Sequence, residues 1–254
     1  MSELFSIQLQ NRQQQGRDGV WLDLPTTTEQ VQAALRQIGI SSDNPQGLFI
    51  SGYFAEEEKR FAIPYNMVLA SNVDELNFLA SRLETLSAGE RAELNAALQA
   101  PQSELFSIGR ITDFPENVDY YVHLPDVHGP AQLGDYYLNR SGMVDMPEEW
   151  KGGIDTAQFG RYVAQQEQGA FTQYGYLVKS GDEWQKVHEG QPVPEEYRVL
   201  SFPAPEVLRD SANIPPPVQP ETEPQKVIPI ILNGKDSTER MKEITDRLET
   251  GIQE

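Results

Sequence analysis

The sequence predicts an α+β protein, arranged as a chain of three small domains that is followed by a proline-rich linker and a short helix. Short stretches of alternating apolar and polar residues, typical of half-buried strands, are separated by runs with helical spacing and capping signals. The chain has 254 residues, of which 38% are hydrophobic, enough for several modest cores. The predicted parts are an N-terminal α+β domain (1–70), a helical middle domain (71–112), a C-terminal α+β domain (113–202), the linker (203–225) and a tail with an amphipathic helix (226–254).

The N-terminal domain is predicted to contain two strands, a helix and a third strand. Thr27 and Gln30 have the spacing of a capping box, which predicts that a helix begins there, and Gly39 suits its end. The apolar stretch 48–54 predicts the strand that follows the helix. The two earlier strands are predicted from apolar residues at every second position: Phe5, Ile7 and Leu9, then Val20, Leu22 and Leu24.

Two helices are predicted in the middle domain. Ser71 is the expected N-cap of the first helix. Ser87 and Glu90 form a capping box ahead of the second helix. Because only a short turn separates them, we expect the two helices to pack as an antiparallel pair.

A six-residue sequence occurs twice in the chain. Ser2–Ile7 is repeated without change as Ser103–Ile108, and a Leu-Pro pair follows at a similar distance each time, at Leu24 and at Leu124. One interpretation is a duplicated strand–strand–helix unit. The other is a chance match of a common strand pattern, which is favoured because the residues in between do not match.

In the C-terminal domain, helix starts are predicted at Pro130, which suits the first helical position, and after Asp155, which is a suitable N-cap. Residues 171–178 and 184–187 are predicted to form a hairpin around Ser180–Asp182. Seven prolines lie between positions 203 and 224 and predict a stiff, extended linker. In the tail, helical spacing gives one apolar stripe: Met241, Ile244, Leu248 and Ile252.

The chain is strongly acidic. It holds 39 Asp and Glu against 20 Lys and Arg, and 31 of these acids but only 15 of these bases lie in residues 1–210. The stretch 113–155 holds nine acids, with Arg140 and Lys151 as its only bases. Such an excess favours solubility and also suits a basic partner. It argues against direct binding to nucleic acid, which requires a Lys/Arg surface.

Motifs for catalysis are absent from the sequence. There is no cysteine, no nucleophile elbow, no P-loop and no EF-hand pattern, and no signal peptide or apolar run of membrane-spanning length. His123 and His128 flank Asp126, but no third ligand stands at a recognisable metal-site spacing. The sequence therefore predicts a cytoplasmic protein that is not an enzyme and binds no cofactor and no metal.

Over residues 1–180 the chain resembles ArdA-type antirestriction proteins in several short sequence segments and in their order and spacing. The segments are Gly19–Pro25, Asp74–Leu79, and, within 134–176, Asp135–Tyr137, Ser141–Gly142, Met146–Glu149, Ile154–Asp155, Phe159–Arg161 and Gly175–Tyr176. The chain departs from the family pattern by its greater length around residues 100–118 and by the linker and tail. Within the tail, Glu239–Glu249 weakly resembles the opening helix of an ArdC-like domain.

The resemblance implies a DNA mimic: an elongated, dimeric α+β protein of three domains whose carboxylates imitate DNA phosphates and occupy the DNA groove of type I restriction-modification enzymes. No single residue is expected to dominate, because phosphate-like contacts are distributed. The predicted partner-binding carboxylates are Asp113, Glu116, Asp119, Asp126, Asp135, Asp145, Glu148, Glu149 and Asp155.

Two other functions stay open. The chain can be an acidic adaptor for a different basic protein, of a mobile element or of the host nucleoid, and the identity of the partner would discriminate this from mimicry. It can also be an enzyme with an unrecognised carboxylate site, which a strongly perturbed carboxyl pair in a deep pocket would indicate.

Overall fold

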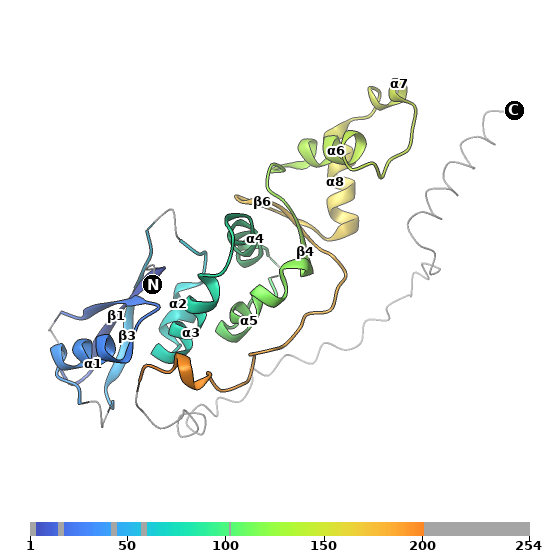
Figure 1. Ribbon diagram of the computed structural model, residues 1–254. Coiled ribbons are helices and arrows are strands. Elements are labelled where there is room, and N and C mark those ends of the chain that lie inside the picture. The colour runs from blue at the N-terminus through green and yellow to red at the C-terminus, as the bar shows by residue number, and fades with distance from the viewer. Residues whose placement is uncertain (1–3, 15–17, 42–44, 57–59, 102, 201–254) are drawn as a thin grey trace, which may run out of the picture. The chain divides into compact units, whose positions relative to one another are not determined.

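The computed structural model describes residues 4–14, 18–41, 45–56, 60–101 and 103–200. These residues form a mixed α+β structure with two small antiparallel sheets and eight α-helices (Figure 1). They belong to one compact unit, Met1–Ala204. The predicted linker and the predicted tail helix lie outside the described residues. No helix in the described part of the chain is long and apolar enough to cross a membrane.

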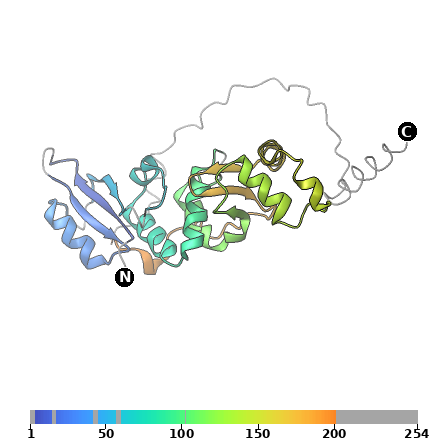
Figure 2. The same cartoon turned by 90° about the horizontal axis from the view of Figure 1, so that it is seen from above.

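The N-terminal sheet confirms the predicted strands and helix. It consists of β1 (Phe5–Asn11), β2 (Val20–Leu24) and β3 (Leu48–Phe54), in the order β2-β1-β3. Helix α1 (Thr28–Gln37) begins at the predicted capping box and lies along one face of the sheet (Figure 2). The apolar face of this helix joins the alternate, inward residues of β1 and β2 in the core.

Four helices follow the first sheet: α2 (Tyr65–Leu69), α3 (Val73–Leu83), α4 (Ala88–Gln99) and α5 (Ile108–Thr112). The capping box at Ser87 is confirmed for α4. The prediction of Ser71 as the N-cap of α3 is wrong, because Asn72 caps that helix and forms a capping box with Glu75. The hydroxyl of Ser71 instead donates to the carbonyl of Met67 at 2.8 Å.

The expected antiparallel pair of helices is also wrong. Helix α3 packs mainly against α5, and α4 packs against strands of the second sheet. Both helices bury apolar side chains in the same core, which runs from Leu4 to Val199. The local sequence therefore located the helices correctly but not their partners, because residues far away in the chain supplied better apolar surfaces.

The second sheet contains β4 (Tyr121–Leu124), β5 (Ala170–Thr172) and β6 (Gly175–Lys179), in the order β4-β6-β5. The hairpin predicted around Ser180–Asp182 is wrong. The turn of the hairpin lies at Gln173–Tyr174, so that β5 pairs with β6, while β4 takes the other side of β6.

Three helices accompany the second sheet: α6 (Pro130–Asn139), α7 (Glu148–Lys151) and α8 (Thr156–Glu167). Pro130 stands at the first turn of α6 as predicted, and Asp155 caps α8 by accepting the backbone N–H of Gln158 at 3.0 Å. The α6 and α8 backbones lie close together at Gly134 and Gly160.

The repeated sequence has two different structures. Its first copy contributes Phe5, Ser6 and Ile7 to strand β1. In its second copy, Ser107 caps α5 and Ile108 opens that helix. The structure thus favours a chance match over a duplicated unit.

Contacts cross the predicted domain boundaries. Asn77 of α3 accepts the backbone N–H of Thr26 at 2.7 Å and donates to the carbonyl of Tyr197 at 2.9 Å. Asp74 accepts the backbone N–H groups of Val199 at 2.7 Å and Leu200 at 2.9 Å. The division at residues 70 and 112 stays a prediction.

Candidate partner-binding surface

Most of the predicted carboxylates lie between β4 and α8. Asp126 follows β4, Asp135 lies in α6, and Asp145 lies in the loop before α7. Glu148 and Glu149 occupy the first turn of α7, where the positive end of the helix dipole favours negative charge. Asp155 is the N-cap of α8. Apart from Asp135, which lies inside α6, these carboxylates therefore stand in loops and at the N-terminal ends of helices.

Three of the predicted carboxylates have basic partners. Asp135 pairs with Arg140 at 2.8 Å, Glu148 pairs with Lys151 at 2.6 Å, and Glu116 pairs with Arg82. Hydrogen bonds from Asn139 and Arg140 lower the pKa of Asp135. These partners partly neutralise the three sites, so they are weaker candidates for contact with an external cation.

Five of the predicted carboxylates form no ion pair with any described residue and are exposed. Their charge is not compensated locally, and it is therefore free to act on a basic partner. They come from the turn before β4, the turn after it, the loop that leads to α7, the first turn of α7 and the N-cap of α8: Asp119, Asp126, Asp145, Glu149 and Asp155.

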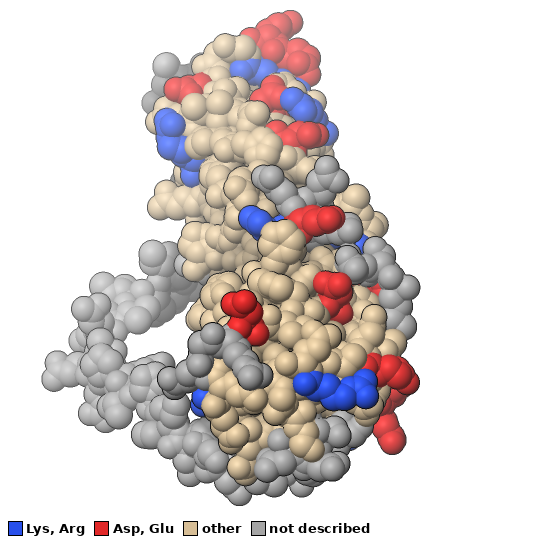
Figure 3. Space-filling view, turned by 90° about the vertical axis from the view of Figure 1, so that its left-hand side faces the viewer, with Lys and Arg blue, Asp and Glu red and all other residues tan. Residues whose placement is uncertain are grey.

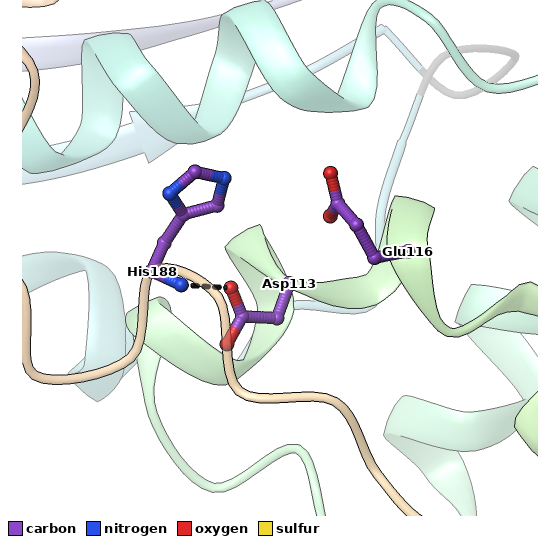
Figure 4. Close-up of side chains that lie close together, drawn as sticks. All are labelled: Asp113, Glu116 and His188. Carbon is purple, nitrogen blue, oxygen red and sulfur yellow. Dashed lines mark hydrogen bonds between the residues drawn. The ribbon is translucent and has the colours of Figure 1, made fainter.

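Asp113 has a different position from the other eight. It is fully buried and accepts three backbone N–H groups, from Val187 at 3.3 Å, His188 at 2.6 Å and Glu189 at 3.1 Å (Figure 4). Because a buried carboxylate presents no surface to a partner, Asp113 is a structural residue. It is therefore not counted among the partner-binding carboxylates.

Asp113 belongs to a set of polar side chains that anchor residues 182–200, which we call the strap. The strap leaves β6 and runs back to α3 (Figure 1, tan to orange). Asn117 accepts the backbone N–H of Gln185 at 2.7 Å and donates to its carbonyl at 3.0 Å. Asn77 and Asp74 of α3 hold its far end through the contacts given above. Apart from a short 3-10 helix at Glu195–Tyr197, the strap has no helix or strand, and these side-chain hydrogen bonds hold it in place.

One group of three potential metal ligands occurs in the described part of the chain: Asp113, Glu116 and His188, with ligand atoms within 4.8 Å of one another. In Figure 4 the carboxylate of Asp113 points to the backbone of His188, away from the carboxylate of Glu116. Both oxygens of Asp113 already accept N–H groups, Glu116 pairs with Arg82, and the ring of His188 packs edge-on against Phe78 at 4.9 Å. The three side chains therefore already have partners within the chain, and their proximity follows from the contacts that hold the strap.

The histidines considered from the sequence have separate contacts. The Nε2 atom of His123 lies 2.7 Å from the carbonyl oxygen of Tyr174, across the second sheet. The backbone N–H of His128 donates to Gln132 at 2.7 Å. The His123–Asp126–His128 segment is not among the three-ligand groups found in the described residues.

The charged side chains are spread out on the face shown in Figure 3. On this face Asp and Glu occur in several separate places, in some of them beside Lys or Arg, with wide uncharged areas between these places. Contacts to a partner on this side would therefore be distributed over several separate carboxylates.

Exposed aromatic side chains were not singled out by the sequence reasoning. Trp21 is 49% exposed and Phe54 is 53% exposed, on neighbouring parts of the N-terminal sheet. A signal for Trp21 was present: since Val20, Leu22 and Leu24 of β2 face inward, the strand period places Trp21 and Asp23 on the opposite face. For Phe54 no such signal exists, because a bulge in β3 changes the side of the sheet to which this residue points.

Glu93 in α4 has a perturbed carboxyl. Burial, with added repulsion from Glu90 and Asp119, raises the pKa of Glu93 to about 8, and one of its oxygens has no hydrogen-bond partner in the described structure. An acid whose folded pKa is raised stabilises the fold below its unfolded pKa of 4.5, and this contribution is lost as the pH rises toward 8. The site lies partly open to solvent, so screening reduces the effect.

We expect Glu93→Gln to raise the free energy of unfolding by about 1–2 kcal/mol at pH 8, after a discount for solvent screening. The gain should shrink toward zero below pH 4.5, where the carboxyl is protonated in both states. Urea unfolding at pH 4, 6 and 8 measures it. Glu149→Gln, an exposed change of the same charge, is the control and should show no such gain; an equal gain there would point to net charge instead of Glu93.

The fold and the surface together define an acid-rich α+β protein with exposed carboxylates that have no basic partner among the described residues. The sequence matches the family model of the ArdA antirestriction proteins over residues 15–178, and the chain belongs to this family. Members of the family are non-enzymatic inhibitors of restriction enzymes, so this is an antirestriction protein and not an enzyme. A comparison with curated proteins finds no significant match.

The family match covers β2 through nearly all of β6, and it thereby includes every predicted partner-binding carboxylate. The strap, which begins at residue 182, lies beyond the match. The resemblance stated from individual phrases is therefore confirmed for most of the folded part.

Proposed function

We propose that the protein inhibits type I restriction-modification enzymes by imitating DNA and occupying their DNA-binding groove. The observation that carries this proposal is the set of five exposed carboxylates without a described basic partner: Asp119, Asp126, Asp145, Glu149 and Asp155. Glu116, Asp135 and Glu148 contribute more weakly, because each already pairs with a base.

The excess negative charge of the protein can be compared with the charge of a length of duplex DNA. Duplex DNA carries one charge per ~1.7 Å of its axis, and a protein that binds it does so through Lys and Arg. A homodimer, which we propose as the active form, would carry about 32 excess negative charges in residues 1–210 of its two chains. That number corresponds to roughly 54 Å of duplex on the same scale. Binding should be fast at low salt and should weaken steeply as salt is added.

Competition with DNA tests the proposal directly. A labelled duplex bound to a type I restriction-modification enzyme should be displaced by stoichiometric amounts of the protein at low salt, and less so at moderate salt. A folded protein that fails to displace the duplex at low salt would overturn the mimicry proposal.

Replacing Asp119, Asp126, Asp145, Glu149 and Asp155 together by Asn or Gln should weaken binding by about 100-fold at low salt, because five exposed charges are each worth up to about 1 kcal/mol. Each single replacement should change the affinity by less than about 5-fold. Asn is itself a good N-cap, so the change at position 155 leaves α8 capped. The affinity is measured by titration at several salt concentrations.

A second variant controls for net charge. It neutralises five exposed acids outside the proposed surface: Asp18, Asp182, Glu183, Glu195 and Glu196. This variant should bind much more tightly than the first, although both lose five charges. Equal losses for the two would mean that total charge alone drives binding, and a single substitution that abolished binding would contradict distributed contacts.

The acidic-adaptor hypothesis predicts the same salt sensitivity but another partner. This hypothesis is supported only if the folded protein leaves the restriction enzyme unaffected and binds a different basic protein with the same dependence on the five carboxylates.

A further inference from the structure

The outer face of the N-terminal sheet, opposite α1, carries two cross-strand rows of side chains. In the first row, Trp21 of β2 stands opposite Gln8 of β1, which stands opposite Gly52 of β3. In the second row, Asp23, Ser6 and Phe54 follow one another across the same three strands. We call these two rows the aromatic face.

The bulge in β3 creates this face. Pairing shifts between Gln8 and Leu9, so Ile50 faces the core while Gly52 and Phe54 face outward. Without the shift, the period of two would place positions 50, 52 and 54 on the same side of the sheet. A large aromatic residue is thereby placed on an open surface, beside a second one from β2.

Trp21 is held in a defined position on this face. Its ring crosses Gln8 and covers Gly52, where an added Cβ would lie only 3.0 Å from the ring and 3.0 Å from Cβ of Gln8. Its ring also meets Phe54 edge to face, with centroids 6.4 Å apart and an interplanar angle of 72°. Trp21 and Phe54 nevertheless each remain about half exposed. An aromatic side chain ordered in advance loses little entropy on binding, as a contact residue requires.

The charge of the aromatic face indicates the chemistry of the group that would bind there. Asp23 is exposed, two positions from Trp21 on the same strand, and its carboxylate accepts the hydroxyl of Ser6 at 2.6 Å. Neither row contains a base. Arg60, an exposed base that approaches β3, donates to the carbonyl of Ala55 at 3.4 Å. Aromatic rings beside a carboxylate suit a guanidinium group, which stacks on the rings and bonds to the carboxylate.

We infer that the aromatic face is a second contact surface, which takes an arginine-bearing surface of the basic partner. This inference rests on the proposed function and adds to it a contact in which aromatic rings supply most of the surface. A second copy of this chain fits the face less well, since it is equally acidic and would bring another Asp23 toward the first. Exposed Trp residues of this kind are frequent hot spots of protein interfaces.

The test measures the salt dependence of affinity for the restriction enzyme. Trp21→Ala with Phe54→Ala should weaken binding by about 10-fold or more at every salt concentration. The slope of the logarithm of affinity against the logarithm of salt should remain that of the wild type, because no charge is removed. Neutralising the five carboxylates of the proposed surface should instead make that slope shallower.

Phe106→Ala is the matched control. Phe106 is 65% exposed, but its ring already has a cationic partner within the chain, the Arg110 guanidinium at 4.8 Å. Its replacement should leave the affinity unchanged. Circular dichroism and sedimentation of each variant check that fold and mass are those of the wild type.

The outcomes separate the two proposals. If the wild type displaces DNA and the Trp21/Phe54 variant does so equally well, the aromatic face is not a contact, while mimicry stands. If the variant changes the oligomeric mass, the face joins two copies and the inference is wrong. If the wild type itself displaces no DNA, both the mimicry and the contact that depends on it are overturned.

Discussion

Gly160→Ala is expected to lower the free energy of unfolding by about 3 kcal/mol, because overpacking of this severity forces two helices apart. A Cβ at Gly160 would lie 1.8 Å from the carbonyl oxygen of Pro130 and 2.8 Å from the backbone nitrogen of Gly134. The contacts are made with backbone, so no side-chain rotation relieves them. Helices α6 and α8 must separate, and the small core between them and the second sheet, around Leu133 and Tyr176, would loosen.

Gly89→Ala is the control for this prediction. Gly89 also belongs to a helix, in the first turn of α4, but an added Cβ would meet nothing within 4 Å among the described residues. Alanine there should stabilise the protein by about 0.5–1 kcal/mol through its better helix propensity. Urea unfolding of both variants checks the opposite signs. A loss below about 1 kcal/mol for Gly160→Ala would mean that the crossing of α6 and α8 is looser than the structure shows.

Asp113→Asn should cost about 3 kcal/mol of stability, although it removes only one buried charge. One oxygen of Asp113 accepts N–H groups from both Val187 and Glu189, and the other accepts that of His188. An amide would turn its NH₂ group, a donor, toward backbone donors and leave at least one N–H group unsatisfied. For a domain of this size the melting temperature should fall by roughly 6–12 °C.

Hydrogen exchange distinguishes this effect from general destabilisation. Backbone amides of residues 187–189 should lose protection first in Asp113→Asn, since the carboxylate anchors the strap there. Asp126→Asn, a change at an exposed carboxylate, should leave both the melting temperature and this protection unchanged. If Asp113→Asn instead behaves like Asp126→Asn in unfolding and weakens binding to the restriction enzyme, Asp113 is a surface contact and its structural role is wrong.

Much of the local structure was predictable from the sequence. The strands of the first sheet followed from their alternation, and three helix starts followed from Thr27, Ser87 and Asp155, whose side chains accept N–H groups of the first turn. These signals act within about four residues, so a short window of sequence contains them completely. Ser71 was predicted as the cap of α3, but its neighbour Asn72 is the cap. Ser and Asn are both favoured at an N-cap, so only the geometry of α3 decides between them.

Long-range contacts decided what local patterns left open or misplaced. In its first copy Leu-Phe-Ser-Ile leads into β1, which begins at Phe5, and in its second copy it leads into α5. In the first copy Ser6 donates to Asp23 of a neighbouring strand, and in the second Ser107 accepts the N–H of Arg110. The same four residues thus take the structure that their partners favour. The misplaced hairpin has the same origin, because β4, about fifty residues earlier in the chain, pairs with β6.

For the candidate surface, too, some properties follow from the sequence and others only from the tertiary structure. Charge is a property of composition, so the sequence by itself determined that the protein is acidic, that it carries no recognisable catalytic motif and that it belongs with the antirestriction proteins. Exposure is a property of packing, and only the tertiary structure decided which carboxylates reach solvent. It buried Asp113 beneath the strap, paired Glu116 with Arg82 across to α3, and turned Phe54 outward through a bulge. Each of these outcomes depends on a contact between residues or strands far apart in the chain, whose free energy no local pattern contains.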